Sequence, residues 1–176
     1  MRITQKIVRL PPRAWDTHVH VFDSSIGPFD PGRAYTPGQA SSQNLIKFSG
    51  SLTEDAWPSN IVLVQPSPYG TDNTVLLETL RRLQTSRQVT ARGIAVIDLE
   101  NTSDEELLAM HECGIRGIRL NLRADGRSFS SLEFTKVLTR AANRIKNLPN
   151  WKLQIYCTGF AWDCMFWRSL LVPFPH

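Results

Sequence analysis

The stretch that decides the fold is residues 60–65 (NIVLVQ), an uninterrupted apolar run that the turn-forming residues 66–70 (PSPYG) bring to an end. Such a run is typical of a strand buried on both faces of a parallel sheet. Asp72 follows at a position that can cap a helix. The leucines of that helix share one apolar face: Leu76, Leu77, Leu80 and Leu83. The stretch therefore predicts a strand followed by a helix that covers it.

The same strand–helix pattern repeats along the chain. Further strands are predicted at residues 14–22, 91–97, 117–122 and 151–156, and further helices at residues 41–51, 103–114 and 131–146. Ser103 and Glu106 form a capping box for the middle one of these helices, and Gly114 is its expected C-cap. The alternation predicts an α/β protein with parallel strands and right-handed crossovers. Five such units fit either an open doubly wound sheet or the first part of an eight-stranded (β/α)₈ TIM-type barrel.

Composition predicts a single soluble domain over residues 1–176. Hydrophobic residues make up 41% and charged residues 20% of the chain, which is ordinary for a globular protein. The formal net charge is +4, and the basic residues are scattered, so we expect no nucleic-acid partner. No apolar stretch approaches the ~20 residues that cross a membrane, and the first residues lack a secretory signal. We therefore expect a cytoplasmic protein with no membrane association.

Cysteine usage and the end of the chain add two expectations. Cys113, Cys157 and Cys164 form no C-x-x-C pair, which argues against a disulfide framework or a structural zinc site. Residues 158–176 form an atypical tail rich in aromatic residues. A sheet that stops at the strand 151–156 has exposed edges, and these can pair with a second copy to give a homo-oligomer.

The most informative polar residues are His18 and His20, in the apolar run 14–22 (AWDTHVHVF). Side chains alternate along a strand, so the two imidazoles are expected to point the same way, with Asp16 behind them. Such a pair near the end of a strand can hold a divalent metal or bind an anionic substrate. A purely structural role for the pair is the alternative.

Other polar residues come at the predicted carboxyl ends of the strands, where parallel α/β proteins bind ligands. Arg119 lies on an otherwise apolar strand and predicts a carboxylate substrate, because burying a guanidinium without an anion is costly. A structural ion pair between Arg119 and Asp98 is an equal alternative to substrate binding. Ser67 and Tyr69 have an equal alternative too, in which they only shape the turn after their strand. The full set is Gln65, Ser67, Asp98, Arg119, Asn121, Gln154 and Tyr156.

Five segments together carry a resemblance to the amidohydrolase-related family, within the metal-dependent hydrolase superfamily. They occur in order at 15–22 (WDTHVHVF), 35–37 (YTP), 64–73 (VQPSPYGTDN), 92–98 (RGIAVID) and 114–121 (GIRGIRLN), and the likeness extends to Tyr156. The chain looks closest to the branch of 2-pyrone-4,6-dicarboxylate lactonase-like proteins. The resemblance implies a (β/α)₈ barrel with the active site at the carboxyl ends of its strands. Members hydrolyse lactones or amides, or decarboxylate aromatic acids.

The resemblance also implies roles for individual residues. His18 and His20 match histidines that bind metal in many members and that polarise the scissile carbonyl without metal in the lactonase branch. Tyr35, Ser67 and Arg119 match positions that contact the dicarboxylate substrate, and Tyr156 lies near a further tyrosine of that site. The family's later histidine and the water-activating aspartate of strand eight have no counterpart here. We therefore expect a barrel cut short after about five β/α units, with weak or absent activity.

Three hypotheses follow. The first is a lactonase-like hydrolase that acts on a carboxylated lactone or a similar cyclic ester, with His18 and His20 as catalytic residues. The second is a decarboxylase of the same family, which holds one divalent metal such as zinc at the same two histidines. The third is a non-catalytic half-barrel that binds a small carboxylate or a partner.

Overall fold

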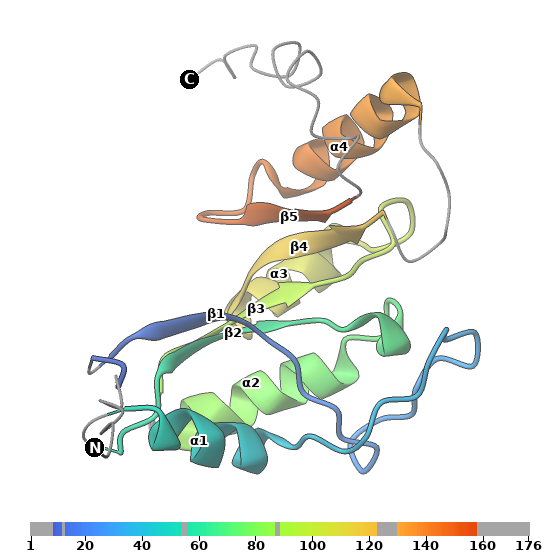
Figure 1. The fold of residues 1–176 in the computed structure, drawn as a ribbon. Coiled ribbons are helices and arrows are strands. Elements are labelled where there is room, and N and C mark those ends of the chain that lie inside the picture. The colour runs from blue at the N-terminus through green and yellow to red at the C-terminus, as the bar shows by residue number, and fades with distance from the viewer. Residues whose placement is uncertain (1–8, 12, 54–55, 87–88, 123–129, 158–176) are drawn as a thin grey trace, which may run out of the picture. The chain divides into compact units, whose positions relative to one another are not determined.

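The computed structural model describes residues 9–11, 13–53, 56–86, 89–122 and 130–157 (Figure 1). The chain divides into two compact units, Met1–Gly93 and Ile94–His176. The aromatic tail 158–176 lies outside the described residues.

The first unit begins with two parallel strands, β1 (Trp15–Val19) and β2 (Asn60–Val64). Helix α1 (Ser42–Ser51) lies between them in sequence, and the short 3₁₀ helix η1 (Ser67–Tyr69) and helix α2 (Thr74–Ser86) follow β2. Helix α2 packs against β2 (Figure 1). It buries Leu76, Leu80 and Leu83 of the predicted apolar face, whereas Leu77 is half-buried. The Asp72 carboxylate accepts a hydrogen bond from the amide of Thr74, the first residue of α2, at 2.9 Å. Asn73, whose carbonyl accepts from the Leu77 amide, holds the N-cap position in place of the predicted Asp72.

Strand β1 contains an irregularity that the sequence does not predict. Trp15 pairs with Asn60 and Asp16 with Ile61, whereas Val19 pairs with Leu63. Three steps along β1 therefore match two steps along β2, which is a β-bulge with one extra residue on β1. The regular strand ends at Val19, and His20 follows directly after it rather than within a strand that continues to residue 22.

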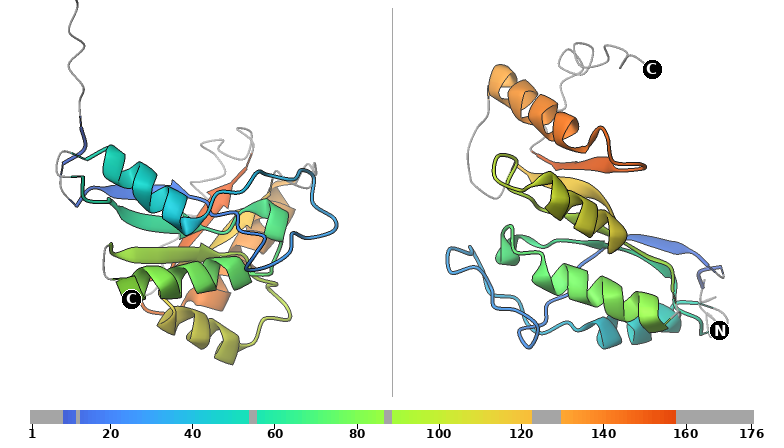
Figure 2. Two further views of the ribbon diagram at one scale, coloured as in Figure 1. Left: turned by 90° about the horizontal axis from the view of Figure 1, so that it is seen from below. Right: turned by 180° about the vertical axis from the view of Figure 1, so that it is seen from behind.

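The second unit contains α3 (Asp104–Glu112), β4 (Ile115–Asn121), α4 (Ser131–Ile145) and β5 (Lys152–Tyr156) (Figure 2). The predicted capping box of Ser103 and Glu106 is confirmed, and Ser130 and Glu133 form a second one at the start of α4. Helix α3 packs on β4 and helix α4 on β5. Strands β4 and β5 are parallel, in continuous register from the pair Gly117 and Lys152 to the pair Asn121 and Tyr156.

Strand order settles which kind of α/β sheet is present. Strand β3 (Ala91–Ala95) carries the boundary between the units, and the hydrogen-bonded order of the sheet is β1-β2-β3-β4-β5. A doubly wound sheet reverses its strand order at a switch point, whereas a (β/α)₈ barrel adds its strands in sequence order. The observed order is that of the barrel class. Among the described residues, no helix is both long and apolar enough for a membrane span.

Candidate active site

The structure brings the two predicted histidines together at the carboxyl end of β1. The ring centroids of His18 and His20 lie 5.0 Å apart, and the ring planes meet edge-on at 82°. The His18 side chain is exposed and that of His20 is half-buried. Two imidazoles this close can act on one substrate group.

The orientation of His20 is fixed by the neighbouring strand. Its Nδ1 atom lies 2.7 Å from the carbonyl oxygen of Val64, the last residue of β2. A carbonyl oxygen can only accept, so Nδ1 carries the proton and donates it to this bond. Ring atom Nε2 is therefore the nitrogen with which His20 can act on a substrate.

Asp16 contacts the backbone of the histidine pair. Its carboxylate Oδ1 accepts a hydrogen bond from the backbone amide of His18 at 3.3 Å. This bond lies within the bulged part of β1, where one amide falls out of the regular ladder. Asp16 therefore braces the backbone that presents the histidines.

The other predicted residues of the first unit lie on the two segments that follow the strands. Ser67 begins η1, directly after β2, and Tyr35 lies in the long segment after β1 with 53% of its surface exposed. Gln65 is fully buried, and its side-chain amide donates to the carbonyl of Asp72 at 2.7 Å. Gln65 thus holds the turn between β2 and α2, which is a structural contact.

In the second unit, Arg119 is paired with an aromatic ring. Its guanidinium carbon lies 5.6 Å from the ring centroid of Tyr156. Arg119 is opposite Gln154 in the β4–β5 register, so Tyr156 is its diagonal neighbour on the same face. A guanidinium over an aromatic face is held by a cation–π interaction and keeps its N–H groups at its edge, where they can bind a carboxylate.

The alternative pairing of Arg119 with Asp98 is wrong. The Asp98 carboxylate accepts from the backbone amides of Glu100 and Asn101 and from the side-chain amide of Asn101, all within its own turn. The side-chain amide of Asn101 lowers the pKa of Asp98 most, and the two backbone amides lower it further. Asp98 therefore closes the loop after β3 and is not the partner of the arginine.

A complete metal site is not present in the part of the chain that the structure describes. Within those residues, no group of three or more histidine, cysteine or acidic side chains could hold an ion. Catalytic zinc sites have three protein ligands, and the histidine pair supplies two. Cys113 and Cys157 are both half-buried, and Cys164 lies outside the described residues.

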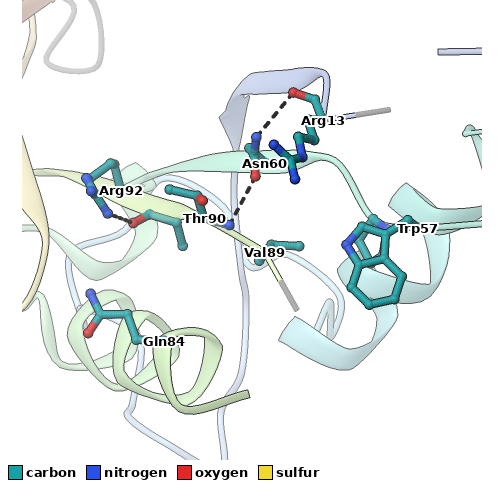
Figure 3. A pocket seen from close by; sticks show the side chains of 9 residues that line it. Arg13, Trp57, Asn60, Gln84, Val89, Thr90 and Arg92 are labelled. Carbon is teal, nitrogen blue, oxygen red and sulfur yellow. Dashed lines mark hydrogen bonds between the residues drawn. The ribbon is translucent and has the colours of Figure 1, made fainter. Parts of the chain in front are cut away.

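A separate pocket of about 580 Å³ lies at the amino ends of the first three strands (Figure 3). Asn60 links its walls, because the Asn60 side chain donates to the carbonyl of Arg13 and accepts from the amide of Thr90. The histidines lie at the opposite, carboxyl end of β1, His18 within the strand and His20 directly after it. This pocket is therefore not the predicted active site.

Two features of the histidine site were missed by reasoning from sequence. The Val64 carbonyl is a backbone group and leaves no mark in the residue pattern. The sequence predicts at most a turn-shaping role for Tyr69. The side chain is nevertheless only 1% exposed, and its ring lies against Phe22 and Phe29. The aromatic residue inside the turn 66–70 (PSPYG) was the available signal, because turns seldom bury a large side chain.

The chain is similar to known hydrolases. A 2-pyrone-4,6-dicarboxylate hydrolase of Comamonas testosteroni is 34% identical over 149 residues, which are 84% of this chain and 45% of that relative. A 4-sulfomuconolactone hydrolase of Hydrogenophaga intermedia is 29% identical over 112 residues, or 61% of this chain and 34% of the relative.

A solved structure gives the same result for the fold. The crystal structure of a probable 2-pyrone-4,6-dicarboxylic acid hydrolase from Acinetobacter baumannii, with citric acid bound, is similar with a TM-score of 0.60 and 27% identity. The match covers 82% of this chain and 49% of that one. The chain spans about half the length of the relatives it matches. The amidohydrolase family model matches residues 15–175, and the chain therefore belongs to the amidohydrolase family.

Proposed function

We propose that this chain provides the carbonyl-polarising and carboxylate-binding residues of a hydrolase that acts on carboxylated lactones. The relatives support this substrate class, because both named activities open a lactone that carries acidic groups. The single observation that carries the proposal is the contact between His18 and His20, with the second ring oriented by Val64. Two adjacent imidazoles after a strand fit an electrophilic role toward a carbonyl.

In the proposed reaction, His20 acts as the imidazolium: Nδ1 donates to the Val64 carbonyl, and Nε2–H donates a hydrogen bond to the carbonyl oxygen of the lactone. Water adds to the carbonyl carbon, and negative charge develops on that oxygen. A donor already held in place stabilises this charge, because it needs no reorganisation during the reaction. Collapse of the tetrahedral intermediate breaks the bond to the ring oxygen, which leaves with a proton. The products are a carboxylic acid and a hydroxyl group on one open chain.

Arg119 is proposed to bind a carboxylate of the same substrate class. The Tyr156 ring beneath it limits the side-chain freedom of the guanidinium, so less entropy is lost when two parallel N–H···O bonds form. The hydroxyl groups of Ser67 and Tyr35 are proposed as further donors to substrate carboxylates. No step is assigned to a metal, because the described residues supply two of the three ligands that a catalytic site uses.

The experiment combines binding with turnover on the purified chain. Calorimetry with 2-pyrone-4,6-dicarboxylate measures affinity, and loss of the pyrone absorbance measures ring opening. The test variant is His20→Asn, whose amide can still donate to Val64 but lacks Nε2. The control is His111→Asn, whose oxygen can replace the Nδ1 atom that accepts from Trp151 Nε1 at 2.9 Å.

We expect the unmodified chain and His111→Asn to bind the pyrone equally, and we expect any ring opening to be lost in His20→Asn. Binding with no ring opening supports a non-catalytic binding module instead. Release of carbon dioxide, together with bound zinc, supports the decarboxylase. A chain that does not bind the pyrone contradicts the proposal.

A further inference from the structure

We infer that Tyr69 is a positioning residue, which holds the loop that carries Tyr35 against the histidine pair and thereby sets the affinity for substrate. The loop comprises residues 23–39, between β1 and α1, and is called the Tyr35 loop below. The inference rests on the proposed function for its link to substrate. The contacts that carry it all lie within the first unit.

Tyr69 is anchored from both its ring and its hydroxyl group. The side chain is 1% exposed, and its hydroxyl oxygen accepts a hydrogen bond from the backbone amide of Asp23 at 2.9 Å. Burial raises the pKa of this phenol, so it stays neutral at physiological pH. Asp23 is the first residue of the Tyr35 loop, and Tyr69 lies in η1, directly after β2. The bond therefore joins the two segments that carry Tyr35 and Ser67.

Ring contacts connect Tyr69 to the histidines on one side. The Phe22 ring lies 6.4 Å from that of Tyr69 at 25°, and 6.1 Å from that of His20. His20 in turn contacts His18. Aromatic rings are rigid and meet in preferred geometries, so the half-buried Phe22 links the position of Tyr69 to that of His20.

On its other side, Tyr69 contacts the middle of the Tyr35 loop. The Phe29 ring lies 4.8 Å from the Tyr69 ring, and the Asp30 amide donates to the carbonyl of Pro68 at 2.8 Å. Gly70 has a φ of +53°, and a Cβ there would lie 2.8 Å from Oδ2 of Asp30. The positive φ favours glycine at this position, and the turn after β2 lies close to the side chain of Asp30 in the loop.

Contacts of Arg33 connect Phe29 to the segment that contains Tyr35. The guanidinium carbon of Arg33 lies 5.7 Å from the Phe29 ring centroid. Arg33 Nε donates to the Thr36 hydroxyl at 2.8 Å, and its terminal nitrogen donates to the carbonyl of Asp30 at 3.0 Å. These bonds enclose Tyr35 on both sides in sequence.

The base of the loop is closed independently of Tyr69. Phe22 and Ala40 exchange two backbone hydrogen bonds, of 3.0 and 2.8 Å. Loss of Tyr69 contacts therefore leaves the ends of the loop in place and frees its middle. Tyr35 itself is 53% exposed, so its position depends on the loop backbone rather than on packing of its own ring. The one buried residue Tyr69 therefore controls how well the middle of the Tyr35 loop is ordered.

The first test measures the loop without reference to activity. Amide hydrogen exchange, followed by mass spectrometry, is compared for the unmodified chain, Tyr69→Phe, Tyr69→Leu and Phe134→Leu. The last variant removes a comparably buried ring (3% exposed) from α4 and controls for general loosening.

We expect Tyr69→Leu to speed exchange in residues 26–33 about tenfold or more, while Phe134→Leu leaves it unchanged. Tyr69→Phe keeps the rings and should speed exchange mainly at Asp23. Equal protection of the loop in Tyr69→Leu and the unmodified chain overturns the positioning role.

The second test measures affinity for 2-pyrone-4,6-dicarboxylate by calorimetry, with KM and kcat wherever ring opening is measurable. We expect Tyr69→Leu to weaken binding about tenfold and to change kcat less than twofold, with affinity restored in Tyr69→Phe. A loop that loosens without any change in affinity overturns the link to substrate. If the unmodified chain does not bind the pyrone, the proposed function and this link fail together, while the exchange result still decides whether Tyr69 orders the loop.

Discussion

The Nδ1 atom of His20 lies 2.7 Å from the carbonyl oxygen of Val64, and this contact limits what the imidazole can do. A neutral ring with its proton on Nδ1 has only a lone pair at Nε2, which accepts and does not donate. His20 can donate to a substrate carbonyl only as the imidazolium, with protons on both nitrogens. The contact therefore makes the proposed role of His20 dependent on pH.

We predict that kcat/KM for the lactone falls as the pH rises through neutrality, because only the imidazolium of His20 carries a proton on Nε2 to donate. The matched variant His20→Asn should show a low rate that does not change with pH. A pH–rate profile measured under identical buffer and salt conditions checks this. A rate that rises over the same range would mean that neutral His20 acts as a general base toward water.

Arg119 and Tyr156 give a prediction about affinity. Arg119→Lys keeps the charge but loses the planar fork, so we expect KM to rise about tenfold or more with little change in kcat. Tyr156→Phe keeps the ring under the guanidinium and should bind nearly as well as the unmodified chain, whereas Tyr156→Leu should not. Arg116→Lys is the control, because Arg116 on the same strand donates to the carbonyl of His111. Equal losses in both lysine variants would mean a general effect of replacing arginine on β4.

Gly117 gives a prediction about stability. A Cβ atom there would lie 2.2 Å from the carbonyl oxygen of Lys152, so the backbones of β4 and β5 would have to separate. We expect Gly117→Ala to lower the free energy of unfolding by about 1–3 kcal/mol or more. Gly38→Ala is the matched control, because nothing lies within 4 Å of the Cβ position at Gly38. Urea unfolding of the two variants checks the difference, and similar midpoints would contradict this packing of β4 against β5.

Two exposed carboxylates predict how the stability responds to acid. The hydroxyl and amide of Ser130 lower the pKa of Glu133, and the side-chain amide of Asn101 and the backbone amides of Glu100 and Asn101 lower that of Asp98. A carboxyl group with a lowered pKa in the folded state stabilises the fold above its unfolded pKa, and this contribution is lost as the pH falls through the folded value. We therefore expect stability to decline below about pH 4.

The double variant Asp98→Asn and Glu133→Gln should show a weaker decline over this acid range. Thermal unfolding at a series of pH values from about 6 to about 3 measures it. Glu106→Gln is a control in the other capping box. A double variant with the same acid dependence as the unmodified chain would show that these two groups do not contribute to it.

The strands and helices were predictable because their signals are local. The apolar run that contains β2, the leucine face of α2 and the capping box of Ser103 and Glu106 each depend on neighbours within a few residues. The β-bulge was not predictable, since it exists only in the pairing of β1 with β2, and those strands are far apart in sequence. The choice between a barrel and an open sheet could not be made from the sequence for the same reason, because strand order depends on which strands pair.

The candidate site was predictable as a set of residue types and not as a set of contacts. His18 and His20 were expected side by side from strand alternation, and their rings do lie together, although an extra residue in β1 changes the backbone that presents them. Asp98 and Gln65 are polar residues at strand ends that serve their own turns. Sequence does not separate such residues from ligand-binding ones, because the two classes share the same positions and differ only in their partners.

The central claim is that the histidine pair, with Nε2 of His20 as the acting atom, binds the carbonyl of a carboxylated lactone. The most direct measurement is ¹⁵N NMR of the imidazoles, of which the chain has only four, with and without 2-pyrone-4,6-dicarboxylate. The account predicts that Nδ1 of His20 is protonated throughout and that the Nε2 signal moves when the pyrone is added, while the signals of His111 do not. Signals of His18 and His20 that stay unchanged at saturating pyrone would contradict it.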